Sequence, residues 1–227
     1  MCLKRASAIQ GVNEMITVWG RNTSSNVQMV MWAIGELGLK HERHDVGGQF
    51  GGNDTPEFLA MNPNGFVPVL RDGDGPFLWE SAAIVRYLGA AYGDATFWPT
   101  DPSRRGDLDK WAEWIKTSFG PAFLTGLFTP LWRTAPANQD PAAIASGEAR
   151  LKVLAPMLDA RLADGPYLGG EDIAFADIIV GTLLYRYFTM DFDRAETPHL
   201  RAYYDRLTGR PAYAEHAMIS YESLRAK

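Results

Sequence analysis

Cysteine is almost absent from this sequence of 227 residues, which contains Cys2 alone. One cysteine cannot form a disulfide within its own chain, so small disulfide-stapled secreted domains are excluded and a reducing compartment is favoured. No apolar run approaches the roughly 20 residues that span a bilayer. Residues 1–14 also lack the apolar stretch of a secretory signal. We therefore expect a soluble, cytoplasmic protein that has no membrane partner.

Basic charge is not in excess either, because 22 Lys and Arg residues stand against 27 Asp and Glu residues, for a net charge of -5. The densest basic cluster, Arg104 and Arg105 near Lys110, is interleaved with aspartates and is typical of a solvated helix face. We expect no nucleic-acid partner. His41 and His44 resemble a metal-binding pair, but residues three apart in a strand point to opposite faces. The sequence therefore predicts no metal site.

The distribution of periodic segments divides the chain into two parts. A content of 46% hydrophobic and 22% charged residues is ordinary for a globular protein and excludes disorder. Residues 15–96 alternate between short β-rich runs and helical spacing, in the order β-α-β and then β-β-α. Prolines in residues 97–103 (FWPTDPS) indicate a linker, after which the strand signals stop. We predict an extension at 1–14, an α/β domain at 15–96, this linker, and an all-α domain at 104–227.

Three places in the first part have residues suited to ligand binding. Residues 22–26 (NTSSN) follow the first strand, where a hydroxyl and a helix N-terminus could stabilise a thiolate or simply cap the helix. Pro68 lies in an apolar strand and indicates an edge strand or a cis peptide, which would leave the main chain of Val67 free for an extended peptide ligand. Glu80 and Ser81 begin a helix, where they could hold an amino-acid head group or act as a cap.

Several motifs in a fixed order resemble those of the soluble glutathione transferases, from about Met15 to Leu224. Residues 62–70 (NPNGFVPVL) are close to a characteristic stretch of that family, and residues 79–88 (WESAAIVRYL) resemble its acidic-serine helix start. In the second part, residues 167–177 (YLGGEDIAFAD) resemble the segment that enters the central helix, and residues 207–211 (LTGRP) resemble the closing motif. The resemblance implies a thioredoxin-like domain that binds glutathione, followed by a helical domain on the acceptor side.

The resemblance also implies roles for residues around the thiol. Ser24 aligns with the activating serine of theta-like and zeta-like members, and Ser25 and Thr23 are the alternatives if the alignment slips by one residue. Asn26 falls where beta-class members carry a cysteine, and asparagine cannot form a mixed disulfide. Conjugation or thiolysis of the serine type is therefore favoured over thiol transfer.

Further contacts to glutathione follow from the same resemblance. Val67, which precedes Pro68, would present its main chain to the cysteinyl part, and Glu80 and Ser81 would bind the γ-glutamyl end. Phe66 stands where relatives often have a lysine, so a contact to the glycine carboxylate is expected to be missing.

On the acceptor side, the helix with Trp114, Ser118 and Phe119 is expected to face the cleft and to suit an apolar, electrophilic small molecule. Ala174 replaces the usual Ser or Thr cap of the central helix and leaves Asp177 without its capping-box partner.

The family implies a homodimer. The alternatives are glutathione-dependent dehalogenation, peroxide reduction or isomerisation, and a binding protein without catalysis.

Overall fold

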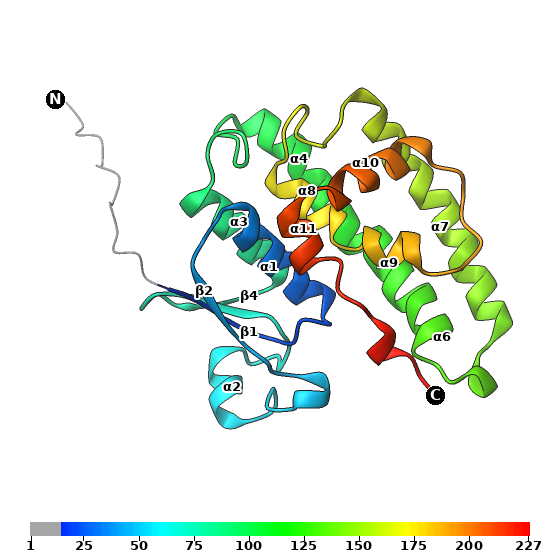
Figure 1. Ribbon diagram of the computed structural model, residues 1–227, viewed down its shortest axis with the longest axis horizontal. Coiled ribbons are helices and arrows are strands. Elements are labelled where there is room, and N and C mark those ends of the chain that lie inside the picture. The colour runs from blue at the N-terminus through cyan, green and yellow to red at the C-terminus, as the bar shows by residue number, and fades with distance from the viewer. Residues whose placement is uncertain (1–14) are drawn as a thin grey trace.

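The computed structural model describes residues 15–227, so the predicted extension at 1–14, which includes Cys2, lies outside the described part. Figure 1 shows a small sheet on one side of the molecule and a larger helical body on the other. The sheet consists of β1 (Ile16–Trp19), β2 (His41–His44), β3 (Val69–Asp72) and β4 (Phe77–Trp79). The strand order is β2-β1-β3-β4, in which β1 is parallel to β2 and the other two pairs are antiparallel.

Three helices accompany the sheet. Helices α1 (Ser25–Glu36) and α3 (Ser81–Tyr92) pack against each other between the sheet and the helical body, and α2 (Pro56–Met61) lies beyond the opposite side of the sheet (Figure 1). The apolar spacing of α1 explains its position, because Val27, Val30 and Ile34 are fully buried. The two packed helices therefore begin near each other, and a hydrogen bond joins Ser81 at the start of α3 to Asn26 at the start of α1.

The second part of the chain is helical. Its helices are α4 (Pro102–Trp114), α5 (Gly120–Phe123), α6 (Thr129–Trp132), α7 (Pro141–Arg161), α8 (Phe175–Gly181), α9 (Leu184–Thr189), α10 (Pro198–Thr208) and α11 (Pro211–His216). All residues of α8 are buried, so this helix lies at the centre of the helical part. The predicted fold class, an α/β part followed by an all-α part, is confirmed. Within residues 15–227, no helix has both the length and the apolar character that a membrane crossing would require.

Two widened, π-helical turns connect α4, α5 and α6. They comprise Ile115–Phe119 and Leu124–Phe128, and a proline, Pro121 or Pro130, comes two residues after the end of each. Proline has no N–H, and its ring clashes with the carbonyl one turn earlier, so a regular α-turn is unfavourable there. A single wide turn accommodates the proline while the helix continues in the same general direction.

Two local features of the first part are the turn after Asp72 and the peptide bond before Pro68. The chain turns after Asp72, where the amide of Gly75 donates to the Asp72 carbonyl at 2.9 Å. The peptide between Val67 and Pro68 is cis, as one of the two interpretations of that proline predicts. The other interpretation is wrong, because β3 is an inner strand that begins only after Pro68, and the proline therefore removes no hydrogen bond from the ladder.

Asp177 anchors the start of the central helix despite its missing partner. Its carboxylate accepts hydrogen bonds from the amides of Ala174 and Leu168, both at 2.8 Å, from the amide of Gly169 at 3.3 Å, and from the Tyr203 hydroxyl at 2.9 Å. Ala174 has no side-chain acceptor to complete the capping box, as the sequence predicts. The buried carboxylate therefore holds this helix start together with a hydrogen bond from the amide of Phe175 to the carbonyl of Phe97 at 3.0 Å.

Candidate active site at the start of two helices

Residues from three segments meet at one edge of the sheet. The Ser81 hydroxyl donates to Oδ1 of Asn26 at 3.1 Å, although 55 residues separate them in the chain. Phe66 and Val67, which lie just before β3, line a cavity together with Asn26, Glu80 and Ser81. The residues that the sequence assigns to thiol and γ-glutamyl binding are therefore brought together by the fold.

Neither serine caps its helix. Ser24 occupies the N-cap position of α1 but makes no capping hydrogen bond, and its hydroxyl has no hydrogen-bond partner among the described residues. Ser81 is the first residue of α3, and its hydroxyl turns to Asn26 instead. By contrast, the side chains of Thr55 and Asp101 each accept a hydrogen bond from a backbone amide at the start of their helices. Capping therefore does not explain why serines occupy these two positions, and the Ser24 hydroxyl is available to a ligand.

Two backbone features border the same site. Val67 has neither its amide nor its carbonyl in a backbone hydrogen bond within the described part of the chain, so both groups can bind an extended ligand. Glu80, which precedes α3, has a φ of 70°, a conformation that is uncommon for residues other than glycine. Such outliers often occur at functional sites, where the surrounding structure holds them in place.

Three cavities adjoin at Asn26 and form one cleft. The first has a volume of about 210 Å³ and includes Ser24 and Val67 in its lining. The second, about 100 Å³, includes Glu80 and Ser81. The third, about 190 Å³, lies between the two parts of the chain and is lined by Ser25, Met29, Ile115, Lys116, Gly120, Pro121, Leu124, Thr125 and Leu183 as well as Asn26. The cleft thus extends from the sheet edge to the widened turns of the helical part.

Lys116 is the residue that the sequence analysis missed. It comes from the widened turn after α4, and its Nζ donates to Oδ1 of Asn26 at 3.1 Å and to Oγ of Ser81 at 3.3 Å. Burial lowers the pKa of Lys116, while the nearby carboxylates of Glu80 and Glu113 oppose this shift. Lys116 therefore adds a cation to the end of the cleft where the sequence suggested a head-group site. No local pattern marks it, because its role depends on packing between the two parts.

None of the three predicted acceptor-side residues lines the observed cleft. Phe119 is fully buried and packs against Trp114, Phe123 and Tyr187, so its assignment to the cleft is wrong. Trp114 and Ser118 are half-buried, and neither lines the cavity beside Lys116. The widened turn explains the difference, because it changes which residues of this segment face the first part.

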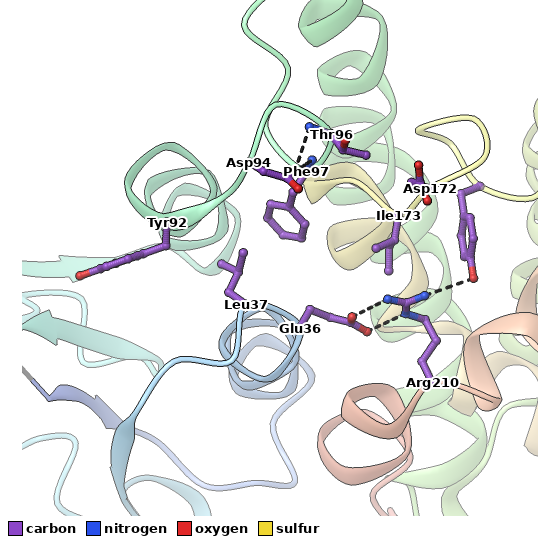
Figure 2. Close-up of a pocket in the computed structure, with 10 residues that line it drawn as sticks. Glu36, Leu37, Tyr92, Asp94, Thr96, Phe97, Asp172, Ile173 and Arg210 are labelled. Atoms are coloured by element: carbon purple, nitrogen blue, oxygen red, sulfur yellow. Dashed lines mark hydrogen bonds and ion pairs between the residues drawn. The ribbon is translucent and has the colours of Figure 1, made fainter. Parts of the chain in front are cut away.

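A larger crevice lies elsewhere in the described part of the chain. Its volume is about 470 Å³, it lies between the two parts, and Arg210 forms an ion pair there with Glu36 at 2.6 Å. Figure 2 shows the residues that line it. The carboxylate of Asp94 accepts the amides of Thr96 and Phe97, also drawn in Figure 2. The hydrogen-bonding groups of Glu36 and Asp94 thus already have partners within the chain. This crevice lies where the two parts of the chain meet.

Among residues 15–227, no group of three or more His, Cys, Asp or Glu side chains could hold a metal ion. The two histidines of β2 have separate neighbours. His41 lies 6.1 Å from the ring of His216, whereas His44 lies 5.8 Å from the ring of Trp19.

Comparison with known proteins gives a consistent assignment for both parts of the chain. Residues 23–91 match the family model described as glutathione S-transferase, N-terminal domain, and residues 110–211 match glutathione S-transferase, C-terminal domain. The chain is 40% identical over 206 residues to glutathione S-transferase GstB of Escherichia coli strain K12, covering 90% of this chain and 99% of that protein.

Solved structures agree with the sequence matches. The chain resembles the theta class glutathione S-transferase of Xanthomonas axonopodis pv. citri with glutathione bound, at a TM-score of 0.86 and 44% identity, over 91% of this chain and 99% of that one. For the apo form of the same protein the TM-score is 0.79 at 39% identity, and the match covers 91% of this chain and 98% of that one. The architecture, the residues at the cleft and these matches together show that the chain belongs to the glutathione S-transferase family.

Proposed function

We propose that this chain binds glutathione in the cleft around Asn26 and transfers its sulfur to an electrophilic small molecule. In this proposal the Glu80 carboxylate accepts a hydrogen bond from the ammonium group of the γ-glutamyl end. Ser81 and Lys116 bind the carboxylate of the same end. The free amide and carbonyl of Val67 pair with the cysteinyl backbone. The relative whose solved structure contains bound glutathione supports the choice of ligand.

The observation that carries the proposal is the unpartnered hydroxyl of Ser24 at the N-terminus of α1. A thiolate placed there accepts a hydrogen bond from this hydroxyl and lies near the positive end of the helix dipole. The first turn of α1 contains no acidic residue that would oppose the anion. One hydrogen bond to a charged group contributes about 1.5–3 kcal/mol, which corresponds to a decrease of about one to two units in the thiol pKa.

In the reaction, the thiol proton leaves to solvent and the thiolate attacks the electrophilic carbon. A carbon–sulfur bond forms, and the leaving group departs with the electron pair of the bond that breaks. The part of the chain around Ser24 acts by keeping the sulfur in its anionic, nucleophilic form. The third cavity, beside Lys116, lies on the side of the cleft where the acceptor would bind.

The test is the Ser24→Ala variant, because it removes the hydroxyl and leaves the peptide-binding groups in place. We expect kcat for a standard electrophile to fall about 10–100-fold at pH 7, while the dissociation constant for S-methylglutathione stays within about twofold. An ultraviolet titration of enzyme-bound glutathione should show a raised thiol pKa.

Two further variants, Ser25→Ala and Thr23→Val, identify the hydroxyl that acts. Unchanged turnover in Ser24→Ala, with a large loss in either of these two, would transfer the role to the neighbouring residue. Failure of the unmodified protein to bind S-methylglutathione at all would refute the proposed function.

Dimerisation and a cytoplasmic location are part of the same proposal and rest on membership of the family. Sedimentation of the purified chain tests the first, since a mass near twice 25.2 kDa is expected.

A further inference from the structure

Ser25 begins α1 and borders a different part of the cleft from its neighbour Ser24. Ser24 lines the cavity of about 210 Å³ together with Val67, whereas Ser25 lines the cavity of about 190 Å³ on the acceptor side. The Cα atoms of consecutive residues are about 3.8 Å apart. Two adjacent serines therefore border the two halves of one cleft, one on the side of the sulfur and one on the side of the acceptor.

The Ser25 side chain is buried without a hydrogen-bond partner. The residue is only 9% exposed, and within residues 15–227 no group pairs with its hydroxyl. Other buried polar side chains, such as those of Gln28 and Thr182, form hydrogen bonds. The buried side chain of Thr197 also forms none in this range, but Thr197 lines no cavity of the cleft. Because an unpaired buried hydroxyl is unfavourable, the position of Ser25 in the cavity wall points to a ligand atom.

The start of α1 adds further donors beside this hydroxyl. The backbone amides of Ser25 and Asn26 donate to no acceptor in the described part of the chain, as is usual in the first turn of a helix. The hydrogen bonds from Ser81 and Lys116 both reach the side-chain oxygen of Asn26, so its side-chain nitrogen is also a free donor among the described residues. Free donors at the positive end of a helix suit an oxygen atom that gains negative charge.

The other walls of the same cavity are mainly apolar. Lys116 is the charged residue of the described lining, and it already donates to Asn26 and Ser81. An apolar molecule with one oxygen near its reactive carbon therefore fits this cavity better than an ionic one. The apolar lining residues are Met29, Ile115, Pro121, Leu124 and Leu183.

We propose that the Ser25 hydroxyl binds the carbonyl oxygen of an α,β-unsaturated carbonyl acceptor, so that this enzyme catalyses the conjugate addition of glutathione to enones. This inference rests on the proposed function and narrows its electrophile from any apolar small molecule to one chemical class. Ser25 is then a second catalytic residue, with a role distinct from that of the hydroxyl that binds the sulfur.

The addition needs neither a leaving group nor a redox partner. The thiolate forms a carbon–sulfur bond to the β-carbon, and the electron pair of the carbon–carbon π bond moves through the conjugated system to the carbonyl oxygen. This oxygen gains negative charge, so its hydrogen bond from Ser25 becomes stronger in the transition state. The α-carbon then takes a proton from solvent, which replaces the thiol proton released earlier and restores the carbonyl group.

The adjacency of Ser24 and Ser25 distinguishes enones from alkyl halides. In a displacement, the leaving group departs on the side of the carbon opposite to the sulfur. An enone in its s-cis form keeps the carbonyl oxygen on the same side as the β-carbon, near the incoming sulfur. Hydroxyls on consecutive residues can then bind the sulfur and the oxygen together. Benzyl chloride has no oxygen for Ser25, so its reaction depends on the Ser24 side alone.

The experiment measures kcat/KM of Ser25→Ala with 4-phenyl-3-buten-2-one and with benzyl chloride, each corrected for its uncatalysed reaction with glutathione. We expect a loss of about ten- to hundredfold for the enone, which is typical of one hydrogen bond to a developing oxyanion, and a change within about twofold for the chloride. Ser24→Ala should slow both acceptors. An equal loss for the two acceptors in Ser25→Ala, or no loss for either, would overturn the proposal. Turnover of the chloride without the enone by the unmodified protein would do the same.

Ser118→Ala is the matched control. Ser118 is half-buried in the widened turn and lines none of the three cavities of the cleft. Its replacement removes the same hydroxyl group and should leave kcat/KM for both acceptors within about twofold. A loss for the enone as large as that in Ser25→Ala would contradict the assignment to Ser25.

A binding measurement separates this inference from the proposed function. S-(3-oxobutyl)glutathione is an adduct of an enone, and S-butylglutathione has the same chain without the carbonyl. By calorimetry, Ser25→Ala should weaken binding of the ketone about two- to tenfold and leave that of the butyl conjugate within about twofold. Equal effects on both conjugates would refute the carbonyl site and leave the glutathione site intact. Failure of the unmodified protein to bind either conjugate would refute the proposed function as well.

Discussion

Lys116 offers the sharpest test of how the two parts of the chain cooperate. We expect Lys116→Met to weaken binding of S-methylglutathione, because methionine keeps the length of the side chain and removes the charge. The methylated ligand has no thiol, so its affinity reports on the γ-glutamyl and backbone contacts alone. Lys116 belongs to the helical part, whereas its partners Asn26 and Ser81 belong to the first part.

The size of the effect follows from the contacts. An ammonium group that meets a carboxylate gains about 1.5–3 kcal/mol, but Lys116 must weaken its present bonds to the Asn26 amide oxygen and the Ser81 hydroxyl, each worth about 0.5–1 kcal/mol. The net contribution is then about 0.5–1 kcal/mol. The dissociation constant should therefore rise about two- to fivefold in the variant.

Isothermal titration calorimetry at pH 7 measures this change, and Lys110→Met is the matched control. Lys110 lies on α4, six residues before Lys116, and its side chain is 62% exposed beside Asp107. Its replacement should leave the affinity within about twofold. An unchanged affinity in Lys116→Met would show that this lysine does not hold the γ-glutamyl carboxylate, and the assignment of that end of the cleft would be wrong.

The pH dependence gives a second measurement on the same pair of proteins. Burial lowers the pKa of Lys116 in the free protein, and a bound carboxylate would raise it again. Binding therefore takes up a proton once the pH exceeds the free-state pKa, and affinity falls as the pH rises through that range. The amino group of the ligand also titrates and affects both proteins. The informative quantity is therefore the difference in affinity for S-methylglutathione between the unmodified protein and Lys116→Met. This difference in affinity should shrink at high pH.

The remaining predictions concern the glycine end and the central helix. Phe66 is 73% exposed at the cleft, so Phe66→Lys should tighten glutathione binding about two- to fivefold by calorimetry, and Phe50→Lys, which is outside the cleft, should not. In urea unfolding, Ala174→Ser should add about 1 kcal/mol by completing the capping box. Asp177→Ala should cost about 3–5 kcal/mol, since it leaves buried donors without partners. A cost under about 1 kcal/mol would contradict the role assigned to Asp177.

Features encoded within a few residues can be read from the sequence. The cap of α2 at Thr55 and the turn from Asp72 to Gly75 depend on their own side chains and backbone preferences. Capping by Ser24 and Ser81, one of the two interpretations open for each, does not occur, for an informative reason. A capping residue is recognised by its type, but whether its hydroxyl turns back to the helix depends on what lies opposite.

Residues that act across the boundary between the two parts could not be found from the sequence. Lys116 and Arg186 reach the first part from helices 90 and 163 residues distant along the chain from their partners Asn26 and Thr23. Neither has a periodic or motif signal, because the packing of the two parts determines what each side chain meets. The prolines at 121 and 130 were the one available hint that the helix before them departs from regular spacing.

The widened turns also bear on how a cleft of this kind can change its lining. A π-turn contains one residue more than an α-turn, so deleting one residue within Ile115–Phe119 would restore regular spacing and rotate α4 by about 100° relative to α5. Single-residue insertions and deletions here would exchange the set of side chains presented to an acceptor. Acceptor preference among proteins with this architecture can thus diverge through length changes in a helix, without any substitution in the glutathione site.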